Sequence, residues 1–119
     1  MTEIYFDNSA TTQVDKPVAD IVYEAMREHY GNPSSHHGKG LAAEKLLTTA
    51  RRDIAKTLAV EENSIIFTAG GTESDNMAIC GLARAYKKRG RHIITTVVEH
   101  PAVLEAVKAL AAEGFTITQ

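Results

Sequence analysis

The sequence has one cysteine, no tryptophan and an aromatic content of only 6%. A single cysteine cannot form an internal disulfide bond, so we expect a reducing, cytoplasmic location. Cysteine and histidine residues do not cluster as metal ligands do, and we expect no metal site. No apolar run approaches the roughly 20 residues of a membrane-spanning helix. Residues 1–12 also lack the basic and apolar regions of a signal peptide, so no membrane association is expected.

An excess of one charge is also missing. Thirteen Lys and Arg residues face 15 Asp and Glu residues, giving a net charge of −2. The basic cluster Lys87-Lys88-Arg89 lies where a helix is expected to end, and cations there are stabilised by the helix dipole. We favour that interpretation over a nucleic-acid patch and expect no nucleic-acid partner. The length of 119 residues suits one domain or a piece of a larger one.

Residues 1–63 are predicted to be mostly helical. Asp15 stands before Pro17 and before apolar residues at helical spacing, which predicts a helix with Asp15 as N-cap and Gly31 beyond its end. A glycine-rich loop, residues 31–40, leads to a second helix predicted over residues 41–58. A short strand is expected at Ile4–Phe6.

Residues 64–119 alternate between two hydrophobic patterns. Compact runs rich in β-branched residues alternate with stretches of helical periodicity. Strands are therefore predicted at 64–68, 92–97 and 115–118, and helices at 73–88 and from Pro101 onward. This order predicts an α/β fold with a parallel βαβαβ sheet and right-handed crossovers.

A turn rich in small residues, Ala69–Ser74, follows the first of these strands. Ligands of open parallel sheets bind beyond the carboxyl ends of the strands. Gly70 and Gly71 would let a ligand approach the backbone, the helix start offers N–H groups to an anion, and Thr72 adds a hydroxyl. A phosphate site and a plain turn capped by Thr72 both fit the residues. The turn matches neither GxGxxG nor GxxxxGK[ST], so a dinucleotide site or a P-loop is unsupported.

A histidine, His100, stands after the next strand. Pro101 suits the first position of a helix, which leaves His100 at or near the N-cap. An imidazole there could stack on a flat ring or transfer protons near neutral pH. A histidine that only caps the helix is the alternative, and the residues alone favour the cap.

Four motifs run nearly from end to end of the chain: YFDNSATT at 5–12, GNPSSHH at 31–37, IFTAGGTESDN at 66–76, and HIIT with EHPAVL at 92–95 and 99–104. Taken together and in this order, they resemble the cysteine desulfurases of the NifS/IscS type. Small departures are Ser9, His36 and Ala69, which stand where alanine, leucine and serine are common. The resemblance covers about the first third of a typical member.

The resemblance implies the fold of pyridoxal phosphate (PLP)-dependent transferases of the aspartate aminotransferase type. Residues 64–119 would begin the large, PLP-binding domain, and the helices of residues 1–63 would contribute to the small domain and to a dimer contact. Gly71 and Thr72 match residues that hold the PLP phosphate. His100 matches the histidine that stacks on the pyridine ring and assists proton transfer. Asn8 and His37 lie in segments near the active site or dimer contact, and we assign them no individual role.

The implied activity is the conversion of L-cysteine to L-alanine, with the sulfur held as an enzyme persulfide. A homodimer would pass this sulfur to an acceptor scaffold protein for iron–sulfur cluster assembly or another sulfur transfer. The lysine that forms the Schiff base with PLP and the nucleophilic cysteine lie further along in the family. We therefore expect an N-terminal fragment, inactive alone. Alternatives are a selenocysteine lyase, another class V aminotransferase, or a non-catalytic fragment that acts as a structural or binding module.

Cys80 invites the role of nucleophile because it is the sole cysteine. It stands two helical turns beyond the glycine-rich turn, among apolar residues, and lacks the context of the family's catalytic cysteine. A small, buried apolar side chain is the interpretation we favour.

Overall fold

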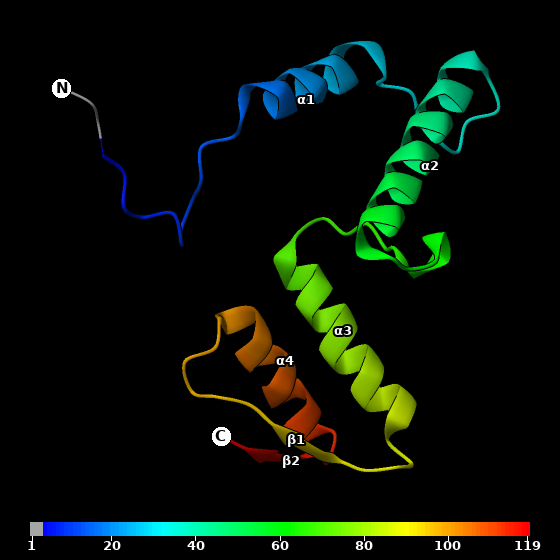
Figure 1. Cartoon of the computed structure of the whole chain (residues 1–119). Coiled ribbons are helices and arrows are strands. Elements are labelled where there is room, and N and C mark those ends of the chain that lie inside the picture. The colour runs from blue at the N-terminus through cyan, green and yellow to red at the C-terminus, as the bar shows by residue number, and fades with distance from the viewer. Residues whose placement is uncertain (1–3) are drawn as a thin grey trace. The chain divides into compact units, whose positions relative to one another are not determined.

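The computed structural model describes residues 4–119, so residues 1–3 of the predicted first domain lie outside the described part. The chain divides between Ile65 and Ile66 into two compact units. The first unit contains α1 (Lys16–Glu28), α2 (Gly38–Leu58) and a 3-10 turn, η1 (Glu62–Ser64). The second contains α3 (Gly71–Tyr86), β1 (His92–Ile94), α4 (Pro101–Ala112) and β2 (Thr116–Thr118), as Figure 1 shows.

The predicted first helix is confirmed, with Asp15 at the N-cap position. The backbone carbonyl of Asp15 accepts hydrogen bonds from the N–H groups of Val18 and Ala19, both at 3.0 Å. The Asp15 carboxylate makes no capping bond, so the main chain alone closes the first turn. The helix ends at Glu28, where the N–H of His29 donates to Ala25 O at 3.2 Å, before Gly31 is reached.

The second predicted helix is also present, but it begins at Gly38 rather than at residue 41. His37 explains the difference, because its Nδ1 accepts a hydrogen bond from the N–H of Gly40 at 3.3 Å and so caps the earlier start. The preceding loop is tightly folded. A Cβ on Gly40 would collide with the carbonyl of Ser35, and one on Gly31 would collide with that of Lys39. Glycine at these two positions lets the loop close against the start of α2.

The expected strand at Ile4–Phe6 is wrong. These residues belong to no strand, and the side chain of Phe6 is 91% exposed. An extended segment becomes a strand only by pairing with another, and the sheet within residues 4–119 consists of β1 and β2. The run of apolar residues alone could not show whether a pairing partner exists.

The second unit confirms a parallel α/β arrangement. β1 and β2 pair in parallel, with His92 opposite Thr116 and Ile94 opposite Thr118, and α4 forms the crossover between them. β1 ends three residues before the predicted position 97. The predicted strand at 64–68 is wrong, because η1 takes up its first residue and the rest does not join the sheet. Ile66 is accordingly 64% exposed.

The core of the second unit lies between α3, α4 and one face of the sheet. Leu110 is fully buried, and Cys80, Ala106 and Phe115 complete the buried cluster. Ile93 and Ile117 pack against this cluster from the two strands. The prediction for Cys80 is confirmed, since its side chain is 8% exposed and its Sγ donates to Ala106 O at 3.9 Å.

An ion pair ties α3 to the residue that follows α4. Arg84 Nε donates to Glu113 Oε2 at 3.1 Å, and Arg84 Nη2 donates to the other carboxylate oxygen. The hydrogen bond from Arg84 lowers the pKa of Glu113 and, reciprocally, raises the pKa of Arg84. Both side chains are partly exposed, so the pair fixes orientation more than it adds stability.

Candidate active site

The turn from residue 68 into α3 is held by three side chains. Thr68 Oγ1 donates to Gly70 O at 3.2 Å and lies 2.6 Å from Ser74 Oγ, so a hydroxyl pair spans the turn. Glu73 reaches back along the chain, and its Oε2 accepts a hydrogen bond from the N–H of Ala69 at 2.6 Å. These bonds fix the backbone of the turn before any ligand is considered.

The first positions of α3 are open to a ligand. Gly70 stands at the N-cap, and no side chain caps the helix within residues 4–119. The helix-start N–H groups therefore have no side-chain acceptor, which is the arrangement that binds anions. A Cβ placed on Gly70 or Gly71 would meet nothing within 4 Å, and a hollow is lined by residues 69–73 and Asn76. The turn thus offers both hydrogen-bond donors and space for an anion.

Thr72 lies in the wall of this hollow and is exposed. Its carbonyl accepts a hydrogen bond from Asn76 Nδ2 at 2.8 Å. Thr72 is the second helical residue of α3, so its hydroxyl does not act as the N-cap. The capping role that the residues left open for Thr72 is therefore wrong, because the helix starts two residues earlier than predicted.

Glu73 places a carboxylate beside the same hollow. A negative charge in the first turn is favourable to the helix dipole, but it opposes a bound anion. The bond from Ala69 N–H directs one carboxylate oxygen toward the backbone. An anion at this helix start therefore depends on the N–H groups and the Thr72 hydroxyl to outweigh the charge of Glu73.

His100 is the N-cap of α4. Its Nδ1 accepts a hydrogen bond from the N–H of Ala102 at 3.1 Å. Its carbonyl accepts from Val103 N at 2.9 Å and Leu104 N at 3.2 Å. The expectation of a capping histidine is confirmed by this geometry. The second ring nitrogen, Nε2, is not used by the cap.

The two candidate positions lie at one end of the second unit. α3 and α4 pack against each other and run in the same direction, so that their N-terminal ends lie together in Figure 1. Gly71 and Thr72 begin α3, and His100 precedes α4. Cys80 is nine residues into α3, roughly 13 Å along the helix axis from Gly71, and faces the core. The fold thus separates Cys80 from the candidate site.

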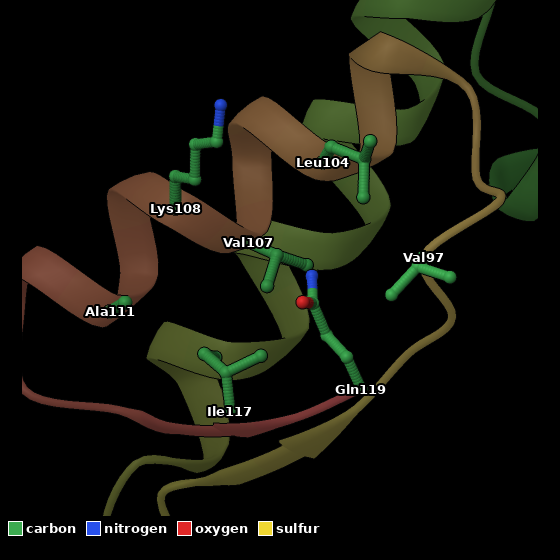
Figure 2. A pocket seen from close by; sticks show the side chains of 7 residues that line it. All are labelled: Val97, Leu104, Val107, Lys108, Ala111, Ile117 and Gln119. Carbon is green, nitrogen blue, oxygen red and sulfur yellow. The ribbon is translucent and has the colours of Figure 1, made fainter.

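Another hollow lies between α4 and the end of β2, as Figure 2 shows. Its lining is mostly aliphatic, and Gln119 extends toward Val107. The charged group in the lining is Lys108, whose Nζ contacts Glu105 Oε1 at 2.6 Å. The Lys108 amine is exposed, is paired with Glu105 and points away from the other lining side chains in Figure 2, so the candidate chemistry lies at the helix starts.

Sequence reasoning missed the residues that support the turn. The sequence did not predict the Thr68–Ser74 hydroxyl pair or the hydrogen bond from the N–H of Ala69 to the Glu73 carboxylate. A signal for Glu73 was present, because a glutamate at the third helical position commonly bonds a backbone N–H before the helix. The five-residue gap between Thr68 and Ser74 carries no comparable signal.

Comparisons with known proteins agree on one family. The family described as aminotransferase class-V matches residues 4–119. A cysteine desulfurase IscS of Methanosarcina thermophila is 47% identical over 115 residues, which are 97% of this chain and 28% of the relative. A cysteine desulfurase of Nostoc sp. is 47% identical over 118 residues, which are 99% of this chain and 29% of the relative.

Solved structures give the same result. A NifS-like protein has a TM-score of 0.87 and 44% identity, covering 98% of this chain and 32% of its own. A structure titled SspA in complex with cysteine has a TM-score of 0.78 and 38% identity, covering 96% and 33%. The chain therefore spans about a third or less of the length of the proteins it matches. Since the family match extends over the whole described part, the chain belongs to the aminotransferase class-V family.

Proposed function

We propose that this chain is the N-terminal, phosphate-binding part of a PLP-dependent cysteine desulfurase. Relatives that bear this name are 45–47% identical to almost the whole chain. The observation that carries the proposal is the uncapped Gly-Gly-Thr start of α3, at the same end of the second unit as His100. Both positions are the ones that the family resemblance assigns to the cofactor.

The residues at the start of α3 fit the phosphate group of PLP. Open space at Gly70 and Gly71 admits phosphate oxygens close to the backbone, where a Cβ would otherwise project. The N–H groups of the first turn and the hydroxyl of Thr72 can each donate a hydrogen bond to those oxygens. The negative charge of the neighbouring Glu73 carboxylate repels a phosphate, and the hydrogen bond from the N–H of Ala69 to this carboxylate partly offsets the repulsion.

PLP, when bound, supplies an electron-withdrawing ring that stabilises a carbanion at the substrate α-carbon. Gly71 and Thr72 would anchor the phosphate and so fix the ring's position. His100 would place its imidazole against that ring and leave Nε2 free to contact the ligand, since Nδ1 is engaged by Ala102. A buried Cys80 cannot reach a substrate sulfur, so the nucleophile would come from elsewhere in the polypeptide.

The finer parts of the proposal concern substrate, partners and location. L-cysteine is proposed as the substrate, which the solved relative in complex with cysteine supports. A homodimer, with the helices of the first unit contributing to the small domain and dimer contact, and a sulfur-accepting scaffold protein are proposed from the resemblance. A cytoplasmic location is proposed from the single cysteine. Among residues 4–119, no helix has the length and apolar character to cross a membrane.

The test is Thr72→Ala in the longer protein. Loss of a hydrogen bond to a charged group costs about 1.5–3 kcal/mol, so PLP affinity should fall about ten- to a hundredfold. Competitive dialysis followed by PLP absorbance measures the dissociation constant. Thr57→Ala is the matched control, because Thr57 is an exposed helical threonine whose hydroxyl donates to the carbonyl of Asp53 at 2.9 Å. Unchanged PLP affinity in Thr72→Ala would exclude Thr72 as a phosphate ligand.

The non-catalytic alternative makes a different prediction. A purely structural or binding module would not bind PLP at α3 in the longer protein, and the purified protein would be colourless. A yellow protein whose absorbance is lost on dialysis against a PLP competitor would exclude that alternative. The two measurements use the same sample.

A further inference from the structure

The hydrogen bond between His100 and α4 fixes the position of a proton. The N–H of Ala102 can only donate, and the atom that receives its bond, at 3.1 Å, is His100 Nδ1. A nitrogen that accepts this bond carries no proton of its own. In a neutral imidazole one nitrogen bears the proton, so here it must be Nε2.

We infer that the amide of Ala102 is a positioning group, which holds His100 as the Nε2–H tautomer and makes it face its ligand as a hydrogen-bond donor. That the ligand is PLP rests on the proposed function, whereas the tautomer rests on the cap alone. Because Nε2 already carries a proton, a second proton can be accepted only at Nδ1. Uptake of that proton breaks the bond to Ala102 and leaves α4 without its cap.

The backbone around the ring supports this assignment. Ala102 is 7% exposed, so its amide is held within the packed start of α4. Pro101 restricts the backbone between the ring and the amide. The carbonyl of His100 is bonded to two further amides of the first turn, at 2.9 and 3.2 Å. The donor and the acceptor are therefore both fixed before a ligand arrives.

The chain provides an internal comparison. His37 caps α2 in the same way, with Nδ1 accepting from the N–H of Gly40 at 3.3 Å. His36 is its exposed neighbour, and within residues 4–119 the structure gives it no hydrogen bond. His37 should therefore share the tautomer of His100, and His36 should show the mixture of tautomers of an unrestrained ring.

The experiment is a long-range ¹H–¹⁵N correlation spectrum of the uniformly ¹⁵N-labelled 119-residue chain. It is recorded well above the ordinary histidine pKa of about 6.5, so that the rings are neutral. We expect Nδ1 of His100 to resonate as an unprotonated nitrogen and Nε2 as a protonated one. A His100 ring with the proton on Nδ1, an equal mixture, or five indistinguishable histidines would overturn the inference.

Amide hydrogen exchange supplies a second readout. His100→Ala should raise the exchange rate of the Ala102 amide, whereas His100→Asn should keep its protection because an Asn oxygen can accept the same bond. Equal exchange of this amide in the parent chain and in His100→Ala would overturn the inference. Neither measurement requires PLP. If His100 is not the Nε2–H tautomer, the cysteine desulfurase proposal therefore still stands. Normal turnover of His100→Asn in the longer protein would instead exclude a catalytic role for His100 and leave the tautomer assignment unchanged.

Discussion

Replacement of His100 separates its structural and chemical contributions. The imidazole caps α4 through one hydrogen bond, from the N–H of Ala102 at 3.1 Å. Loss of an N-cap side chain costs about 1 kcal/mol, whereas Asn is as good a cap as any residue. His100→Ala should therefore destabilise the folded chain by about 1 kcal/mol, and His100→Asn should be nearly neutral.

Thermal unfolding followed by circular dichroism measures this difference on the 119-residue chain. For a domain of roughly this size, 1 kcal/mol corresponds to a fall in Tm of about 4 °C. His37→Ala is the matched control, because it removes an equivalent cap from α2. A His100→Asn variant that loses as much stability as His100→Ala would refute the capping argument.

Steady-state kinetics in the longer protein measures the chemical contribution. If His100 assists proton transfer as well as capping α4, His100→Asn should lower turnover by about 10²–10⁴-fold, the usual contribution of general acid–base catalysis. Its affinity for PLP should fall only modestly, since stacking adds about 0.5–1.5 kcal/mol. Near-normal turnover in His100→Asn would leave His100 as a cap without a catalytic role.

Four further substitutions, one of them a control, test the fold. Gly40→Ala should destabilise the first unit by about 1–3 kcal/mol, because the new Cβ would collide with the backbone carbonyl of Ser35. Gly38→Ala is the control and should be tolerated, because a Cβ there would meet nothing within 4 Å. Urea unfolding of both variants measures the difference. Ala59→Gly should raise stability by up to about 1 kcal/mol, because Ala59 has a left-handed φ of 54° at the end of α2; an unchanged urea midpoint would contradict this. Arg84→Gln should raise the pKa of the Glu113 carboxyl toward its ordinary value, and ¹³C titration measures it. In the parent chain the pKa of Glu113 is lower in the folded state than in the unfolded state. The ion pair therefore stabilises the fold above the unfolded-state pKa, and this stabilisation is lost as the pH falls through the folded-state pKa. Arg84→Gln should make stability less sensitive to acid.

Helices were predicted from the sequence more accurately than strands. Each helix carries its own signals, such as Pro17 and Pro101 in the first turns, and its hydrogen bonds are local. α1 and α4 begin where these signals predict. α2 and α3 begin earlier because their starts depend on a histidine cap at His37 and on a glycine at position 70, which propensity alone does not reveal.

Strands could not be predicted equally well because their hydrogen bonds come from elsewhere in the chain. Residues 64–68 and 92–97 both have the β-branched composition of a strand, yet only His92–Ile94 is paired. The difference is the presence of β2 beside β1, which no local pattern of residues 64–68 encodes. Composition indicates where a strand is possible, and pairing decides whether it forms.

The candidate site shows a related limit on inference from single residues. For His100, the sequence offered a helix cap and a catalytic group as competing interpretations. The structure makes them compatible, because an imidazole has two nitrogens and α4 uses only Nδ1. The cap orients the ring and leaves Nε2 for a ligand. A capping role for this histidine is therefore no evidence against a catalytic one, and only a substitution that keeps the cap while removing the imidazole can distinguish them.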